Sequence, residues 1–485
     1  MVIDPYMLDI AEKDVSSARL AELALPTLEH DYVKKIIPGK NGLSFLQIPP
    51  EFVLVGHSSG GDYSIQNPSD YAVSVVKRLV RDSRKIGALP VAMADVIDAR
   101  STDLDFVDSV GIPMADLAQK YGVAILNGEL AKYGAMMNCP CNITGTMLGL
   151  LNRRAAYADQ GVFEVDGIKY FVIDPKGKMI WMNSDGTGTN TLIKGRFGKF
   201  NLSYDDMLAM LADDKAKFGG GAVALFGLLE HNRADFPVRQ VLEYADGRAR
   251  EQGLVSILQP ELVRNRLVGP HGEKIVYNMS GNLVSRVDND ITEKMPKPKA
   301  GDYLIAVKGF GRSNGFTDRR NLVAEWFGNN WHKTQGGAWF GEFLSKSSIV
   351  FYKDTVDLFN KKIISLFTHM SGGAFRDKLA KQIKKFGFYA EIGLADGSPQ
   401  LYKPDPREAA IAAQFKLEDA HTKFAMCNEG FFVAVDGKQE EVLAELKARG
   451  YEAKIVCRLE EGKGRVGLKF RASCGDVVDF SEKAA

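Results

Sequence analysis

Short apolar runs alternate along the chain with longer segments in which apolar residues recur every three to four positions. The short runs predict buried β-strands, and the longer period predicts helices with one buried face. From about residue 50 the order is an apolar run, a Gly-rich turn, a helical segment, a strand, a second helical segment and a strand that ends at Glu129. This order predicts an α+β domain.

The same order of elements then occurs a second time. The segments VAILNGELAK and VSILQPELVR place Glu129 opposite Glu261, 132 positions apart (261 − 129). The segments RDSRKIGALPVAM and DDKAKFGGGAVAL set Asp82 opposite Asp214 at the same offset (214 − 82 = 132). Two pairs of matching segments with the same offset predict a duplicated α+β domain.

A polar, Pro-containing linker at residues 286–302 leads to a third region that repeats neither copy. Strands and helices alternate there as far as about residue 470. We therefore predict four segments: a peripheral extension at 1–50, a first copy at 51–158, a second copy at 159–298 and a C-terminal α+β domain at 299–485.

Charge and composition narrow the class of partner. Among 485 residues, 62 Lys and Arg stand against 61 Asp and Glu, so the chain has no electrostatic reason to prefer nucleic acid or an anionic membrane. No apolar run approaches the length of a membrane span, the start lacks a signal pattern, and the Cys-Pro-Cys segment at 139–141 lacks zinc or redox spacing. We expect a cytoplasmic protein with free thiols and a small-molecule ligand.

The segment SDGTGTN, residues 184–190, is the first candidate for ligand chemistry. Its glycines would let the backbone approach a polyphosphate, its threonines could donate to phosphate oxygens, and Asp185 could hold Mg²⁺. The segment has neither Walker A nor dinucleotide-binding spacing. Taken alone, an ordinary tight turn is about as good an interpretation as a phosphate loop.

The acids at the repeat landmarks add a second candidate. In a shared fold Asp214 and Glu261 could converge with Asp185 into a carboxylate set for Mg²⁺. The alternative is a helix-surface role for Asp214 and a solvated position for Glu261. Their recurrence in both copies favours the functional interpretation.

The third region contains two Gly/Ser-rich turns that open helices, at residues 309–317 and 368–375. Such turns can present N–H groups to anions, although they can equally be plain entry turns. His369 could act as a base or as a structural residue. Lys194 and Arg312 could each neutralise a phosphate or simply be solvated.

The order of these motifs resembles aminoimidazole ribonucleotide (AIR) synthetase, also called phosphoribosylformylglycinamidine cyclo-ligase, and its ATP-dependent relatives, from about residue 165 to 470. DGTGTN resembles the family loop D-G-x-G-T-K with Asn190 in place of lysine, and GRSNGF resembles P-H-S-N-G-Y with Arg312 in place of histidine. HMSGG, from His369, resembles H-x-T/S-G-G-G, whereas QPELV departs from G-G-E-T-A-E and the first copy has lost the loop pattern.

The resemblance implies that the two copies form a β-barrel within one chain, so that the chain is a monomeric pseudo-dimer or a homodimer, with ATP at the barrel interface. It implies an ATP- and Mg²⁺-dependent ligase of purine biosynthesis that closes a ring on a phosphoribosyl-type substrate. The alternatives are a related phosphotransferase or amide-activating enzyme, or a non-catalytic structural or ligand-binding homologue. Loss of the loop lysine removes a contact of roughly 1.5–3 kcal/mol.

The residues carried over from the family fall into four groups. They are Asp185, Asp214 and Glu261 for Mg²⁺; Gly186, Thr187, Gly188, Thr189, Asn190 and Lys194 for the nucleotide; Arg312, Ser313, Asn314, Gly315, Ser371, Gly372 and Gly373 for the substrate; and Asp185 with His369 for catalysis.

Overall fold

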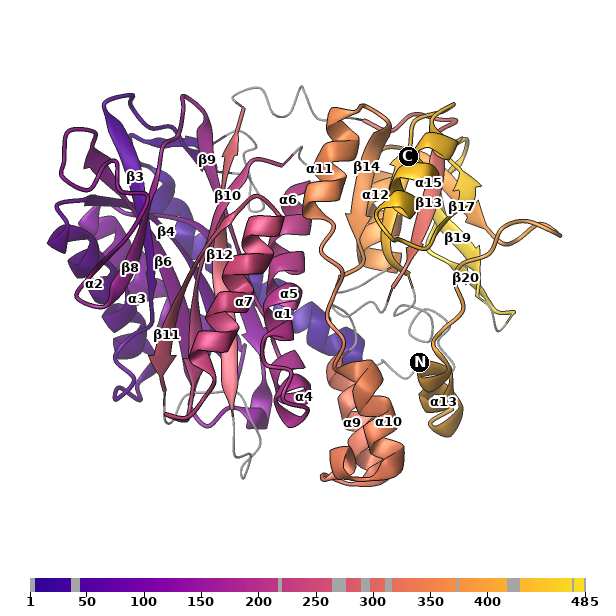
Figure 1. Cartoon of the computed structure of the whole chain (residues 1–485), viewed down its shortest axis with the longest axis horizontal. Helices are drawn as coiled ribbons and strands as arrows, with labels where there is room; N and C mark the ends of the chain where they lie inside the picture. Colours follow the sequence, from indigo (N-terminus) through magenta and orange to yellow (C-terminus); the bar gives the residue numbers. More distant parts are fainter. Residues whose placement is uncertain are drawn as a thin grey trace. The chain divides into compact units, whose positions relative to one another are not determined.

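The computed structural model describes residues 5–35, 44–216, 220–263, 276–288, 297–309, 316–371, 375–416, 428–472 and 475–483. The chain divides into two compact units (Figure 1). Unit 1 consists of Met1–Gly195 and Gly221–Asn289, and unit 2 of Arg196–Gly220 and Asp290–Ala485.

The first sheet of unit 1 has six strands in the order β5-β4-β6-β3-β8-β7. Their bounds are β3 (Phe52–Ser59), β4 (Leu89–Ala99), β5 (Ala124–Lys132), β6 (Cys141–Asn152), β7 (Val162–Val165) and β8 (Ile168–Ile173). Helices α2 (Pro68–Lys85) and α3 (Leu104–Tyr121) pack on one face, and α1 (Pro5–Ala24) packs on α3 and β5. The side chain of Asp103 caps the start of α3, and Gly122 ends it with a φ of 66°.

The second sheet of unit 1 has the order β1-β2-β9-β12-β10-β11. Its strands are β1 (Val33–Lys35), β2 (Ser44–Leu46), β9 (Met179–Gly186), β10 (Ala222–His231), β11 (Val255–Leu262) and β12 (Tyr277–Val287), and α7 (Val238–Glu251) packs against β11. The order β11-β10-β12-β9 matches β5-β4-β6-β3 of the first sheet, with the same parallel and antiparallel pairings. The succession of strands and helices expected in each half is found in part: the strand expected to end at Glu129 continues to Lys132, and β6 and β12 were not expected.

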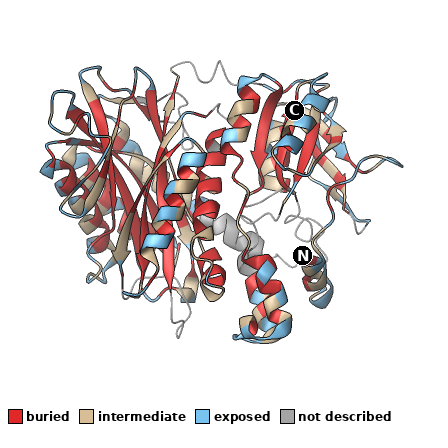
Figure 2. Cartoon of the chain, in the orientation of Figure 1, coloured by how far each residue is buried: buried red, intermediate tan, exposed pale blue. Residues whose placement is uncertain are grey.

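The two sheets pack face to face, and Figure 2 shows their strands as largely buried. One half of the space between them is apolar and includes Leu54, Leu148 and Phe226. The other half is polar, because every second residue of β6 and β12 there carries a hydroxyl or amide group. The hydroxyls of Thr144 and Ser280 are 2.5 Å apart.

Among the described residues the strands of unit 1 form two separate open sheets, and the expected closed β-barrel is not found. Strand β2 pairs with one edge of β9 and strand β8 with one edge of β3. These pairings are short, one residue of β9 and residues 54–56 of β3. Side chains make the contacts between the sheets, and the backbone amide of Ser184 donates to Asn127 Oδ1 at 3.0 Å.

Unit 2 is a mixed α/β structure with two sheets, in the orders β14-β16-β13-β17 and β18-β15-β19-β20, with β21 also on β19. The strands are β13 (Tyr303–Lys308), β14 (Ile364–His369), β15 (Phe388–Ile392), β16 (Asn428–Ala434), β17 (Ala453–Arg458), β18 (Glu460–Glu461), β19 (Arg465–Arg471), β20 (Val477–Asp479) and β21 (Glu482–Lys483).

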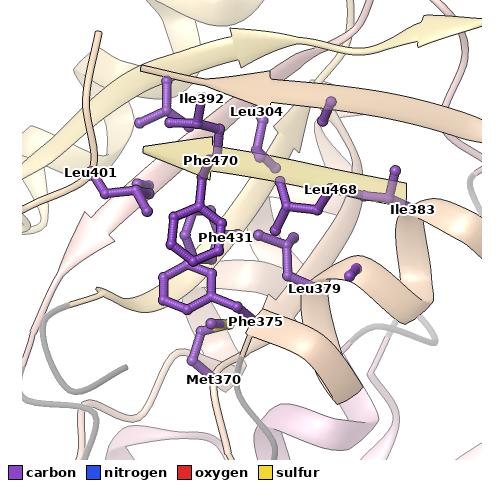
Figure 3. Close-up of a cluster of buried hydrophobic side chains, with 14 of the residues drawn as sticks. Leu304, Met370, Phe375, Leu379, Ile383, Ile392, Leu401, Phe431, Leu468 and Phe470 are labelled. Carbon is purple, nitrogen blue, oxygen red and sulfur yellow. The ribbon is translucent and has the colours of Figure 1, made fainter. Parts of the chain in front are cut away.

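Helical segments surround these sheets. They are α5 (Leu202–Leu208), the π-helical η3 (Ala209–Asp213), α6 (Asp214–Ala216), α9 (Phe316–Phe327), α10 (Gln335–Leu344), α11 (Tyr352–Asn360), the π-helical η5 (Phe375–Ala380), α12 (Lys381–Lys385), α13 (Pro406–Gln414) and α15 (Gln439–Ala448). The core shown in Figure 3 contains the rings of Phe375, Phe431 and Phe470, with a centroid distance of 4.7 Å between Phe375 and Phe470. No helix in the described ranges is both long and apolar enough to cross a membrane.

Candidate functional site

The DGTGT segment forms the turn between strand β9, which ends at Gly186, and helix α4 (Asn190–Arg196). Both the amide and the hydroxyl of Thr187 donate to the carbonyl of Met279, each at 2.9 Å. Gly188 has a φ of 59°, a conformation that glycine adopts without strain. The amide of Gly186 donates to Asp185 Oδ1 at 2.7 Å. The segment is thus a tight turn whose backbone groups lie beside the carboxylate of Asp185.

Carboxyl groups from the first sheet lie close to this turn. Tyr133, which follows β5, donates its hydroxyl to Asp98 of β4. That hydroxyl also lies 3.6 Å from the position a Cβ on Gly188 would occupy. Asp98, Asp185 and Glu129 all help to raise the pKa of Tyr133, although burial is the largest cause. We call Asp98, Glu129, Tyr133 and Asp185 the loop cluster.

Asp98 is buried within the loop cluster. Burial raises its pKa to about 7, and the hydrogen bonds from Asn278 and Tyr133 offset only part of that effect. Asn278 Nδ2 donates to Asp98 Oδ2 at 2.8 Å. The loop cluster therefore contains acids of different character, a buried one that titrates near neutrality and the half-buried Asp185 and Glu129.

A second group of side chains includes two acids that lie 132 positions after acids of the loop cluster. The 132-residue offset relates Asp98 to Glu230 (98 + 132 = 230) and Glu129 to Glu261 (129 + 132 = 261). The hydroxyl of Tyr63 donates to Glu261, and it lies 3.1 Å from Glu230 Oε1. We call Tyr63, Arg78, Glu230 and Glu261 the closed cluster.

Two further contacts complete the closed cluster. Arg78 Nη2 lies 3.1 Å from Glu261 Oε1, so both oxygens of that carboxylate are engaged by the protein. Asn142 Nδ2 donates to Glu230 Oε2 at 2.7 Å. Gly60 makes room for this packing, because a Cβ there would lie 2.1 Å from the Tyr63 hydroxyl oxygen.

The protonation state of the closed cluster follows from its single phenolic proton. Tyr63 can donate to only one of the two acids that its oxygen contacts. Burial raises the pKa of Glu230 to about 8, and the neighbouring Glu261 adds to this rise. Glu261 instead forms an ion pair with Arg78. The consistent arrangement has neutral Glu230 donating to Tyr63, and Tyr63 donating to Glu261, which is paired with Arg78.

Polar side chains connect the two clusters across the space between the sheets. Asn282 Nδ2 donates to Thr146 Oγ1 at 2.7 Å, and Ser184 Oγ donates to Asn282 Oδ1 at 2.6 Å. The hydroxyls of Ser58 and Thr146 are 2.7 Å apart. Together with Thr144 and Ser280, these residues form what we call the polar ladder. Buried polar groups are thus satisfied by partners from the opposite sheet.

Two of the three predicted magnesium ligands, Asp185 and Glu261, do not lie together. Asp185 on β9 and Glu261 on β11 are separated by β12 and β10, which at ordinary strand spacing is about 14 Å. Asp214 begins α6, and its side chain lies outside the described residues. Instead, Glu129, the repeat-related counterpart of Glu261, shares the surroundings of Tyr133 with Asp185. In the described part of the chain, no three His, Cys, Asp or Glu side chains are placed to hold a metal ion.

The remaining residues predicted for the nucleotide lie at the start of α4. Thr189, Asn190 and Lys194 are all buried, and the Lys194 side chain is 0 % exposed. Lys194 is therefore a buried cation with partners in the protein. The alternative that Lys194 is solvated is not observed.

The predicted substrate and catalytic residues of the C-terminal region belong to unit 2. His369 ends β14, is buried, and has its Nδ1 4.0 Å from Asp213 Oδ2. Asp213 Oδ1 also accepts from the amide of Phe351 at 2.9 Å. Ser371 is half-buried. The other predicted substrate residues, Arg312, Ser313, Asn314, Gly315, Gly372 and Gly373, lie outside the described residues.

Sequence reasoning did not identify Asp98, Tyr133 or Glu230. The available signal was the offset itself, because Asp98 and Glu230 are acids 132 positions apart near the ends of corresponding strands. The contact of Tyr133 with the turn had no such signal, since it joins segments more than fifty residues apart.

Comparison with known proteins agrees with the resemblance. The sequence model of the family described as "AIR synthase related protein, N-terminal domain" matches residues 46–151. The phosphoribosylformylglycinamidine cyclo-ligase of Pyrococcus horikoshii is 25% identical over 289 residues, which are 58% of this chain and 79% of that protein. The cyclo-ligase of Pyrococcus furiosus is 25% identical over 302 residues, 60% of this chain and 83% of that protein.

Similar solved structures include phosphoribosylformylglycinamidine synthase II from Thermotoga maritima, with 11% identity, a TM-score of 0.39 and coverage of 66% of this chain. This chain spans less than half of that protein, 45%. Thiamine-monophosphate kinase from Stenotrophomonas maltophilia has 10% identity and a TM-score of 0.29, with coverage of 93% of this chain and 95% of that one.

The sequence matches define the class first: the chain is a mixed α/β protein whose residues 46–151 are similar to the N-terminal domain of AIR synthase-related proteins. The resemblance of this sequence to the AIR synthase family is thereby confirmed, and the relatives of the chain include cyclo-ligases. The matched residues form most of the first sheet, in the copy whose loop had lost the family pattern.

Proposed function

We propose that the chain is an ATP- and Mg²⁺-dependent enzyme of the AIR synthase type that acts on a phosphorylated small molecule. The observation that carries this proposal is the meeting of the turn after Asp185 with Asp98 and Glu129 of the opposite sheet, in a chain related to cyclo-ligases. The reaction of those relatives is the first candidate, with phosphoribosylformylglycinamidine as substrate.

We further propose that residues 51–158 and 159–298 are two copies of one domain, that 1–50 is an extension and that 299–485 is the C-terminal domain. The matching strand orders and the 132-residue offset support the duplication. The ligand site would then be composite, with its turn from the second copy and its acids from the first. Residues His369 and 371–373 in unit 2, and 312–315, remain proposed substrate contacts.

In this site the backbone amides of Gly188 and Thr189 would meet the phosphates. Carboxylate oxygens are the ligands that Mg²⁺ prefers, and Asp185 and Glu129 would hold the ion. When bound, Mg²⁺ would neutralise charge on the phosphates. Asp98, which accepts from the Tyr133 hydroxyl, would keep Tyr133 oriented towards the turn.

The closed cluster supports the choice of this end of unit 1 over the other. Both oxygens of Glu261 are engaged, by Tyr63 and Arg78. A metal ion there would have to displace the Arg78 guanidinium and the Tyr63 hydroxyl, at a cost of roughly 1.5–3 kcal/mol for the charge-assisted contact alone.

A matched pair of variants tests this assignment. We expect Glu129→Gln to weaken Mg²⁺–ATP binding at least tenfold by calorimetry, and Glu261→Gln to change it less than twofold. The reverse order of effects would move the site to the other end. Asp185→Asn should abolish hydrolysis, and unchanged hydrolysis in that variant would remove the turn from the site.

Turnover decides between the candidate functions. Purified protein with formylglycinamidine ribonucleotide, ATP and Mg²⁺ should form the cyclised product, with a known cyclo-ligase assayed alongside as a positive control. Hydrolysis of ATP without that product would favour a related phosphotransferase or amide-activating enzyme. Absence of nucleotide binding at millimolar ATP would favour a non-catalytic homologue. The ATP concentration is set this high because Asn190 replaces the family lysine.

A further inference from the structure

A cavity of about 230 Å³ opens in unit 1 beside the segment that joins β6 to β7. Its walls come from the start of β3, from this joining segment and from the end of β8. Three short apolar side chains, an arginine, two acids and a glycine line it.

This cavity is remote from the loop cluster. Asp98 of β4 pairs with Asn142 near the start of β6, whereas Arg153 directly follows the end of β6. Eleven positions (153 − 142 = 11) separate Asn142 from Arg153. In an extended strand this separation spans about 35 Å. A ligand of the cavity is therefore distinct from a ligand of the turn at residues 186–190.

The cavity presents charges of both signs. Arg153 Nη2 donates to Asp174 Oδ1 and Arg153 Nε to the carbonyl of Pro50, each at 2.6 Å. These contacts hold the guanidinium in place, and among the described residues its Nη1 has no hydrogen-bond acceptor. The hydrogen bond from Arg153 lowers the pKa of Asp174. Asp159, the second acid, is exposed and has no hydrogen-bond partner within the described part of the chain.

The rest of the lining is apolar and leaves room for a small molecule only. Val53 and Ala158 are buried, and Val172 is half-buried. A Cβ on Gly161 would meet no atom within 4 Å, so the cavity is open on that side. Sites for drug-sized ligands usually measure about 300–1,000 Å³. This smaller cavity therefore suits a molecule smaller than a nucleotide.

A ligand with a single charge fits this lining poorly. An anion drawn to Arg153 would lie beside Asp159 and Asp174, and a cation drawn to these acids would lie beside Arg153. A zwitterion satisfies both signs at once. An α-amino acid carries an ammonium group with three N–H donors and a carboxylate, the group that a guanidinium binds best.

We propose that this cavity binds an α-amino acid with a short aliphatic side chain. Its carboxylate accepts from Arg153 Nη1, and its ammonium group donates to Asp159. Its side chain packs against Val53, Ala158 and Val172. The inference is independent of the proposed function and gives the chain a second ligand of another chemical class.

The test compares L-valine with two compounds that each lack one of its charged groups, isovalerate without the ammonium group and isobutylamine without the carboxylate. Binding to the whole chain is measured by calorimetry at millimolar ligand. The principal variant is Asp159→Lys, because Asp159 is exposed and its replacement leaves the core intact. Glu164→Lys is the matched control, since it makes the same change of charge at an exposed residue of β7 that does not line the cavity. Thermal melting of each variant checks that it is folded.

We expect wild-type protein to bind L-valine, and to bind isovalerate and isobutylamine about fivefold more weakly, which is the loss of one exposed ion pair. In Asp159→Lys the affinity for L-valine should fall about tenfold, because the ammonium group loses its acceptor and meets a second cation. Isovalerate should bind this variant more tightly than it binds wild type, a gain that misfolding cannot produce. Glu164→Lys should change none of the three affinities.

Three results would overturn the inference. The first is wild-type protein that binds no L-valine at millimolar concentration. The second is isovalerate or isobutylamine bound as tightly as L-valine, which would make the cavity a site for a simple anion or cation. The third is L-valine affinity that Asp159→Lys leaves unchanged, which would place the ligand elsewhere. Because these measurements use no nucleotide, none of the three outcomes bears on the proposed function.

Discussion

Glu230 offers the sharpest test of the electrostatics of unit 1. The side chain is fully buried, accepts from Asn142 at 2.7 Å and contacts the Tyr63 hydroxyl at 3.1 Å. Glu230→Gln should preserve both contacts, because the amide oxygen can accept from Asn142 and the amide nitrogen can donate to Tyr63. The variant therefore removes only the titrating proton.

The magnitude follows from the shift in pKa. Burial raises the pKa of Glu230 from 4.5 to about 8, so between these values the folded chain binds a proton that the unfolded chain has lost. The free energy of unfolding then falls as pH rises, by about 1.4 kcal/mol per pH unit, and the fall ends as pH passes through the folded pKa. Between pH 6 and pH 8 wild-type protein should lose about 2 kcal/mol relative to Glu230→Gln.

The assay is urea denaturation of both proteins at pH 6, 7 and 8, since titrating groups that do not interact with Glu230 cancel in the difference. Glu164→Gln is the control, because Glu164 is an exposed glutamate of β7. A stability difference between wild type and Glu230→Gln that stays constant over this range, or that reverses in sign, would refute the neutral state assigned to Glu230.

Four further substitutions test the packing. Tyr63→Phe removes the hydroxyl shared by the two acids of the closed cluster and should cost about 1–3 kcal/mol in urea denaturation; no loss would mean that water replaces it fully. Glu408→Ala leaves the guanidinium of Arg319 buried without its ion-pair partner, and should cost about 3–5 kcal/mol, whereas a loss below about 1 kcal/mol would contradict that burial. Gly221→Ala places a Cβ 1.9 Å from a backbone carbonyl oxygen at a φ of 85° and should lower the melting temperature, whereas Gly247→Ala, with open space around it in α7, should raise it slightly.

The elements that bury an apolar face were predictable from the sequence. The periodic segments that became α2, α3 and α7 and the apolar runs that became β4 and β10 all have strong local signals. Strands β6 and β12, which lie in the middle of their sheets, were not predicted. Their inward positions carry Asn, Thr and Ser, which read as loop residues in a sequence but are satisfied here by the opposite sheet.

The candidate site was only partly accessible from the sequence. The turn after Asp185 was identified by its glycines, and the offset pointed to Glu129 as well as Glu261. Which of the two acids meets the turn depends on how the two sheets face each other, and a linear pattern carries no such information. The position of Tyr133 beside Gly188 depends on the same packing.

The placement of both sheets in one chain has a consequence for how the two clusters can differ. In an assembly of two identical subunits, any substitution is present twice, and both ends of the interface change together. Here the position of Tyr63 exists once, so its side chain can fill one end while the other keeps an open turn. In a single chain the two ends of the contact between the sheets can therefore carry different side chains and serve different functions, whereas in a symmetric dimer they would be identical.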